Sequence, residues 1–405
     1  MLNYTYRARN VASGEKVKGV IQADSEGAAI KLINEQGLTP TDIKLGQAGF
    51  GGFTGKRVKA RDRVLFSRQL STLINAGLPL LQALRSVNEQ TTSKPLKVIL
   101  NEVIGSLEGG GTLSAALAKH PKVFNQVYIS MIAAGETSGT LDKALDRLAI
   151  QQEKDADLVS KVRGALTYPL VVIFVMIAVV GFMIVKVLPQ VKSIYEGFDN
   201  VQLPLITRIL LAISDFTIHF WWVVLIVLAL LGFFGTRYAR TGPGKEVVDK
   251  FKMRMPPLGP LFMKMYMARF ARTGSTLVAS GVPLLQMLQI TGDAVNNVHV
   301  KRSIDKAAEK VRGGKSLADA IGTDPNFLPL VPSMLKIGEQ SGSMEEMLAK
   351  AADYYEKEVD NQVATISSII EPVMMVLLGV VAFIIVAAVL LPIYGLAGNS
   401  QFSGS

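Results

Sequence analysis

The chain of 405 residues contains no cysteine, which excludes disulfides, thiolate metal sites and a thiol nucleophile. It is also poor in charge, because 19% of its residues are charged against roughly 25% in an ordinary soluble domain. Almost half of the residues (49%) are hydrophobic, yet the net charge is +10. This balance argues against a disordered chain, a disulfide-stapled secreted module and a permease that fills the bilayer. It favours membrane segments attached to sizeable soluble parts.

Three uncharged or nearly uncharged runs are long enough to cross a hydrocarbon core, which takes about 20 apolar residues. They predict transmembrane helices at 164–188, 216–236 and 372–393. Because three such runs occur in one chain, we interpret them as membrane spans rather than as core helices of a soluble protein. The first residues, Met1–Arg7, lack the apolar region of a cleaved signal peptide.

The basic residues predict which way the chain faces. Of the 43 lysines and arginines, 40 lie in residues 1–167 and 237–371. The segment 189–215 has two, and the tail after the last apolar run has none. Because basic loops stay in the cytoplasm, we expect both basic blocks inside and the segment 189–215 outside. The positive charge then reflects topology and anionic lipid, and no aromatic-interleaved basic stripe indicates nucleic-acid binding.

An internal repeat sets the expected architecture. Residues 66–84 and 270–288 are identical at 11 of 19 positions. Later in each copy the motif G-E-x-S-G recurs at 135–139 and 338–342. Self-similarity at a fixed offset indicates a duplicated structural unit. We therefore predict two homologous cytoplasmic helical bundles, each continuing into its own long helix and membrane span.

The predicted fold class is a mainly α polytopic membrane protein with a small N-terminal αβ domain. Residues ahead of the repeats alternate as strand, strand, helix and strand, and a glycine-rich segment follows. The predicted parts are 1–46 (αβ domain), 47–56 (linker), 57–163 (first bundle), 164–188 (span), 189–215 (external loop), 216–236 (span), 237–371 (second bundle), 372–393 (span) and 394–405 (external tail).

Glycine and hydroxyl residues predict where helices begin and end in both copies. Gly77 and Gly281 follow apolar-periodic segments, where a left-handed residue ends a helix. Thr112 and Ser316 are expected N-caps of the following helices. Gly313-Gly314-Lys315-Ser316 resembles the end of a phosphate-binding loop, but the required earlier glycine is absent. We interpret that segment as a capped helix start.

No constellation of catalytic groups is apparent, so we predict neither enzymatic activity nor a cofactor or metal. His120, His219 and His299 fall in unrelated places. Acidic side chains gather along both long helices, and we interpret them as a solvated helix face in preference to a cation site. These residues are Asp142, Asp146, Glu153, Asp155 and Asp157 in the first copy, and Asp353, Glu356, Glu358 and Asp360 in the second.

The paired G-E-x-S-G motifs supply the candidate partner contacts, Glu136 and Gly139 in the first copy and Glu339 and Gly342 in the second. We place both glutamates in loops just before the long helices. A carboxylate near a helix N-terminus is favourable by itself. A structural role and a role in binding a partner therefore both remain open.

Arg68 and Arg272 occupy equivalent positions and are further candidate contacts, although surface or intra-bundle pairing is the commoner role for such residues. At the membrane entries the chain reads Tyr168-Pro169 and Glu371-Pro372. An ionisable residue at the membrane edge indicates function by default, and an interfacial carboxylate in water is the alternative for Glu371.

The doubled R-x-x-S-T-L-x-x-x-G-x-P-L-L-x-x-L pattern, the doubled G-E-x-S-G and the two proline-led membrane entries resemble the PilC/GspF family over nearly the whole chain. These are inner-membrane platform proteins of type IV pili and type II secretion. The resemblance implies a non-enzymatic, homo-oligomeric protein of the bacterial inner membrane. Its implied partners are a hexameric assembly ATPase, a retraction ATPase, pilins, alignment proteins and lipid. We favour the pilus branch over the secretion branch.

The two copies are not identical in their motifs. Asp319 has no acidic match in the first copy, and Thr137 differs from Gln340. The two bundles therefore need not bind alike. A transporter or channel subunit is the competing class, but it predicts several buried polar groups within the spans, where this chain has essentially His219. A membrane enzyme ranks third.

Overall fold

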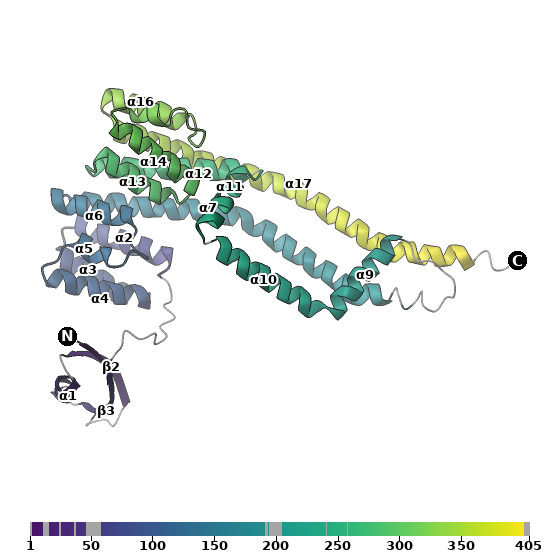
Figure 1. Ribbon diagram of the computed structural model, residues 1–405, viewed down its shortest axis with the longest axis horizontal. Helices are drawn as coiled ribbons and strands as arrows, with labels where there is room; N and C mark the ends of the chain where they lie inside the picture. The colour runs from purple at the N-terminus through teal and green to yellow at the C-terminus, as the bar shows by residue number, and fades with distance from the viewer. Residues whose placement is uncertain are drawn as a thin grey trace. The chain divides into compact units, whose positions relative to one another are not determined.

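The computed structural model describes residues 2–10, 16–23, 26–35, 38–45, 58–190, 193, 205–239, 241–256 and 258–400 (Figure 1). The chain divides into two units, residues 1–57 and 58–405. The predicted linker 47–56 lies outside the described residues.

The N-terminal unit is a three-stranded antiparallel sheet with one helix. Its elements are β1 (Leu2–Asn10), β2 (Lys16–Ala23), α1 (Glu26–Glu35) and β3 (Leu38–Leu45). The strand order is β2-β1-β3, so the central strand pairs Tyr6 with Gly19 on one side and with Ile43 on the other. Ala8 on β1 and Ile33 on α1 are buried together. The alternating residues of β1 thus place a small apolar core between sheet and helix.

The larger unit contains the two repeats, each built from five helices and one long helix. The first repeat comprises α2 (Ala60–Asn75), α3 (Leu80–Gln90), α4 (Lys94–Glu108), α5 (Leu113–Ala118), α6 (Gln126–Ser138) and α7 (Leu141–Phe182). The second comprises α12 (Leu258–Ala279), α13 (Leu284–Val295), α14 (Val298–Arg312), α15 (Leu317–Ile321), α16 (Leu330–Ser341) and α17 (Met344–Ser400). The element order is therefore the same in both copies, as a duplicated unit requires.

Residues that begin and end these helices behave as the sequence predicts. Gly77 and Gly281 have φ of 87° and 78°, the left-handed region that glycine enters without steric cost. Thr112 accepts a hydrogen bond from the backbone N–H of Ala115 at 3.2 Å and caps α5. Ser316 does the same for α15, which makes the segment resembling a phosphate-binding loop a capped helix start.

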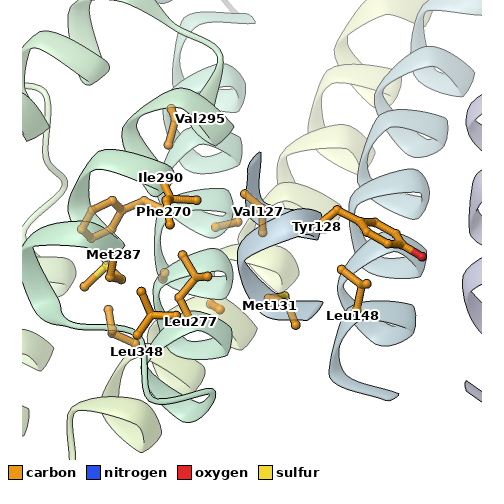
Figure 2. Packing of buried hydrophobic residues seen from close by; sticks show 14 of the residues in the cluster. Val127, Tyr128, Met131, Leu148, Phe270, Leu277, Met287, Ile290, Val295 and Leu348 are labelled. Atoms are coloured by element: carbon orange, nitrogen blue, oxygen red, sulfur yellow. The ribbon is translucent and has the colours of Figure 1, made fainter. Parts of the chain in front are cut away.

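The two bundles share one apolar core. Buried side chains of both repeats form a single cluster, and Figure 2 shows part of it. Val127 on α6 lies toward Leu277 and Ile290 of the second repeat, whereas Tyr128 points the other way, into its own bundle. Consecutive residues of α6 thus serve two interfaces, because a helix turns by about 100° per residue.

Two of the described helices are long and apolar enough to cross a membrane. At 1.5 Å per residue, α7 extends about 63 Å and α17 about 86 Å. The most apolar stretch of α7 has a mean hydropathy of 3.0 and is entirely unburied, and that of α17 has 2.2 and is 11% buried. Beyond Phe182 the first of them continues through a π-helical turn, Met183–Val187. Apolar stretches of this length that the described residues leave uncovered are suited to a membrane or to the apolar surface of a partner.

The structure corrects three predicted boundaries. The predicted span 216–236 is not one continuous helix, because α9 (Leu205–His219) ends within it and α10 (Trp221–Ala239) begins after Phe220. The segment 189–215 is not loop throughout, since α9 occupies its last residues. The predicted tail 394–405 is helical as far as Ser400.

The amphipathic character of α9 explains the first two corrections. Its residues Leu211 and Ser214 are buried, and the Ser214 hydroxyl donates to the carbonyl of Ile184. A helix that packs one side against a neighbour has fewer apolar residues than a span. Because the uncharged run 216–236 includes the last residues of α9, the sequence prediction assigned the end of α9 to the following span.

The first glycine of each G-E-x-S-G motif lets two helices meet closely. A Cβ on Gly135 would lie 2.6 Å from Cβ of Ala144 on α7. A Cβ on Gly338 would lie 3.0 Å from Cα of Met344 on α17. The second glycines, Gly139 and Gly342, have φ of 70° and 71° and end α6 and α16. The motif therefore builds the tight corner from which each long helix starts.

We expect Gly135→Ala to lower the free energy of unfolding by about 2 kcal/mol, because an added methyl group has no room at this crossing. Gly105→Ala is the matched control, since no atom lies within 4 Å of a Cβ there. Alanine in that exposed turn of α4 should stabilise the helix by up to about 1 kcal/mol. Unfolding of the purified protein in detergent measures both. Equal effects of the two substitutions would contradict the close-packing explanation.

Candidate functional site

The glutamates of the paired motifs bind helix N-termini inside their own bundles. Glu136, near the end of α6, accepts hydrogen bonds from the backbone N–H groups of Leu113 and Ser114, the latter at 3.1 Å. The Ser114 hydroxyl donates to the same carboxylate. A carboxylate at this position satisfies free N–H groups and the positive end of the α5 dipole.

The second repeat repeats this arrangement. Glu339 on α16 accepts from the N–H groups of Leu317 and Ala318, the latter at 3.1 Å. Our placement of Glu136 and Glu339 in loops is therefore wrong, because both lie within the last turn of a helix. The helix continues past them until the left-handed glycine three residues later.

The two equivalent arginines pair with carboxylates on the long helix of their own repeat. Arg68 on α2 donates to Glu153 from both Nε, at 2.6 Å, and Nη2, and to Asp146 at 3.2 Å. The hydrogen bond from Arg68 lowers the pKa of Glu153. Arg272 on α12 donates to Glu356 at 2.8 Å and to Asp353. Each arginine thus fastens the first helix of its bundle to the long helix.

Other acidic residues of the long helices hold the two repeats together. Lys154 on α7 pairs with Glu356 on α17 at 3.0 Å, and Lys161 pairs with Asp360 at 2.8 Å. In the opposite direction, Asp155 on α7 accepts from Arg269 on α12 at 2.7 Å. Hydrogen bonds to Asp157 and Asp360 raise the pKa of Lys161. We call these three ion pairs the inter-repeat ion pairs.

The interpretation of the acidic runs as a solvated face is consequently wrong for Glu356, whereas Asp155 and Asp360 are paired but remain partly exposed. Glu356 is buried and lies between Lys154 and Arg272. Among the described residues, no group of three metal-ligating side chains is suited to an ion. Sequence reasoning missed the pairs because their lysines and arginines lie in the other copy, more than 100 residues away. The equivalent placing of Glu153 and Glu356 signals only the arginine pairs within each repeat, not the pairs between the repeats.

A buried hydrogen-bonded contact lies beside the inter-repeat ion pairs. Gln151 on α7 donates to Thr273 on α12 at 3.0 Å and accepts from Thr276 at 3.2 Å. All three side chains are less than 9% exposed. A buried amide satisfied on both its polar atoms fixes the register of two helices, since sliding either helix would leave it unpaired.

A polar cavity of about 220 Å³ lies between the long helices next to these contacts. Its lining residues are Lys154, Asp157, Leu158, Lys161, Asp353, Glu356, Lys357 and Asp360. Opposite charges are nearly balanced around it, and Lys154 and Lys161 already bind carboxylates. The cavity fits water between ion pairs better than it fits a charged ligand.

The three predicted membrane-edge residues lie within the two long helices. Pro169 is inside α7, and Glu371 and Pro372 are inside α17. Both residues of the second pair are exposed, whereas Pro169 is partly covered. The structure does not bring them together with the paired motifs. From Leu141 to Gly164, α7 rises about 35 Å, so the motif corners lie far from the predicted membrane entry.

These features define a class: a duplicated helical scaffold whose bundles are continuous with long, lipid-suited helices. The chain belongs to the type II secretion system protein F family. The profile "Type II secretion system (T2SS), protein F" matches residues 66–189 and 270–392, which are the two repeats. The profile of the N-terminal domain of that protein matches residues 1–44.

Named relatives come from both pilus and secretion machines. "Type IV pilus assembly protein PilC" of Thermus thermophilus is 39% identical over 98% of each chain. The protein of the same name in Pseudomonas aeruginosa is 35% identical over 91% of this chain and 98% of its own. "Type II secretion system protein F" of Pseudomonas aeruginosa is 36% identical over 95% of this chain and 96% of its own. Family membership agrees with the resemblance carried by the motifs.

We expect Arg272→Ala to destabilise the protein more than Arg68→Ala does. The Arg272 side chain is 16% exposed and its partner Glu356 11%, against 36% and 42% for Arg68 and Glu153. Without Arg272 the poorly solvated carboxylate of Glu356 keeps Lys154 as its remaining partner, so we expect a cost of about 2 kcal/mol, whereas the exposed pair is worth about 1 kcal/mol.

Unfolding of the purified variants in detergent measures these costs. Arg85→Ala is the control, since Arg85 and Glu108 form an ion pair that is 60% and 43% exposed. That variant should unfold like the unmodified protein. A smaller loss for Arg272→Ala than for Arg68→Ala would contradict the proposed importance of burial.

Proposed function

We propose that this protein is the inner-membrane platform of a type IV pilus assembly machine and couples a hexameric cytoplasmic ATPase to insertion or extraction of pilin subunits. The observation that carries the proposal is the direct continuation of each bundle into a long helix with an apolar, uncovered segment. The names of the relatives support the pilus setting. A platform of a type II secretion system is the alternative, supported by the relatives named for that system.

The proposed topology has three spans with the N-terminus and both bundles in the cytoplasm. Two spans belong to α7 and α17. The third is α10, whose 19 residues extend about 28 Å, close to the hydrocarbon thickness. The concentration of lysine and arginine in residues 1–167 and 237–371 supports this orientation. It places the C-terminus on the periplasmic side.

Single cysteines test this topology, because the chain has none of its own. Ser193→Cys should react with a membrane-impermeant maleimide from the periplasmic side of intact cells. Ser280→Cys, at the end of α12, should react only in inverted membrane vesicles. Labelling of both positions from the same side would overturn the three-span arrangement.

The proposed mechanism is transmission of force by rigid helices. The inter-repeat ion pairs and the buried Gln151 contact hold α7 against α12 and α17. A displacement of either bundle is then passed along both long helices, because packed elements move as units. We propose that pilins contact the membrane segments, where apolar side chains such as Phe174 and Phe383 are exposed.

The corners built by the paired motifs are the proposed contacts of the ATPase. They lie at the starts of the long helices, about 35 Å along α7 from the predicted membrane entry. Thr137, Gly139, Ser341 and Gly342 are exposed there. Glu136 and Glu339 shape the corners by holding α5 and α15. The energy source has to lie outside this chain, which we propose to be non-enzymatic.

Charge reversal tests this assignment, with stability as the second readout. We expect Glu136→Lys and Glu339→Lys to reduce recruitment of the ATPase and pilus formation, because each change releases a capped helix at a corner. Glu136→Gln keeps an acceptor and should retain most of both. Normal recruitment and fibre assembly in both lysine variants would remove these residues from the contact. Ion flux through the purified protein in liposomes would instead favour the transporter class.

A further inference from the structure

One helix of the larger unit belongs to neither repeat and lies between α10 and α12. This helix, α11 (Gly242–Arg254), begins three residues after Ala239, where α10 ends. Positions 204 residues earlier in the chain are 38–50, which comprise strand β3 of the N-terminal unit and the start of the predicted linker, so the first copy has no counterpart. The role of α11 therefore has to be sought in the second repeat alone.

The inner side of α11 is fastened to the second bundle. Asp249, 2% exposed, accepts from the backbone N–H of Val298 at 3.0 Å and thereby holds the start of α14. Glu246 pairs with Arg302 at 3.0 Å, and its carbonyl lies 3.1 Å from Nε2 of His299. These contacts fix the rotation of α11 about its own axis.

The outer side of α11 combines two apolar residues with two cations. Val247 is 57% and Phe251 63% exposed, and Lys250 and Arg254 are exposed beside them. Positions i, i+3, i+4 and i+7 lie on one face of a helix. Within the described part of the chain, neither cation pairs with a carboxylate. We call these four residues the outer face.

The bend between α10 and α11 is sterically defined. Thr241 caps α11 by accepting from the N–H of Gly244 at 3.3 Å, and its own N–H donates to the carbonyl of Tyr238 at 2.9 Å. A Cβ on Gly244 would lie 1.8 Å from that carbonyl oxygen. Only glycine permits this approach, so the direction in which α11 leaves α10 is built into the backbone.

We propose that the outer face of α11 docks on the anionic cytoplasmic surface of the membrane, with Val247 and Phe251 inserted among the lipids and Lys250 and Arg254 on phosphate groups. The inference rests on the proposed third span. Since α10 has the length of the hydrocarbon core, α11 starts at the headgroup layer. An apolar strip flanked by cations is what an interfacial helix presents, and each cation strengthens binding to an anionic surface roughly fivefold.

The test uses Val247→Cys carrying an environment-sensitive fluorophore in the full chain, reconstituted into vesicles of phosphatidylcholine with or without phosphatidylglycerol. The label should shift to the blue in the anionic mixture and be quenched by lipids that are spin-labelled near the headgroup. Ile337→Cys on α16 is the matched control, because Ile337 is also apolar and 46% exposed. Its label should stay unquenched in both mixtures.

A second variant and a second position separate the outcomes. Adding Lys250→Glu and Arg254→Glu should reduce quenching in the anionic mixture to the level in phosphatidylcholine alone. A label at Leu228, in the middle of α10, should be quenched by lipids spin-labelled deep in the acyl chain. Quenching at Leu228 without quenching at Val247 overturns the docking and leaves the span intact. No quenching at Leu228 overturns the span itself. A blue shift without lipid quenching means that a second copy covers the face, which also overturns the proposal.

Discussion

The packing of α7 against α12 and α17 is the contact on which the rest of the larger unit depends. It joins two apolar cores into one, and it places Gln151, Lys154 and Asp155 opposite groups of the other repeat. Apolar burial supplies most of the stabilisation, because it acts over the whole contact. The polar groups make the packing specific, since their hydrogen bonds and ion pairs form in only one register of the helices.

One carboxylate of this molecule takes part in two ion pairs. Arg272 and Lys154 both bind Glu356, so one carboxylate links the second bundle internally and links it to the first repeat. Partly buried pairs gain from a lower local dielectric and are less screened by salt than exposed ones. Most of the acidic residues in the predicted helix-surface runs therefore form ion pairs with lysines and arginines of the same chain.

Much of the fold follows from local patterns, and the remainder depends on contacts distant in sequence. Helix ends at Gly77 and Gly281 and the cap at Thr112 were predictable, because a left-handed glycine or a hydroxyl N-cap acts within a few residues. The pairing of Arg68 with the long helix was among the predicted roles. The helix break at Phe220 was not predictable from local patterns. It separates α10 from α9, and α9 is recognisable only by its packing, in which the Ser214 hydroxyl donates to the carbonyl of Ile184.

The site was harder to predict for the same reason. Glu136 was identified by its repetition, but its function in the fold appears only when α5 and α6 are seen together. The motifs indicate an asymmetry of the repeats at Asp319 and Thr137, but they do not indicate a further one on the long helices. Gln151 is buried between them, whereas Tyr354, at the equivalent position of the second copy, is 51% exposed. Duplication has thus produced two long helices with unlike surroundings: α7 is covered by α12 at Gln151, whereas α17 is open at Tyr354, so the two repeats present different surfaces at equivalent positions.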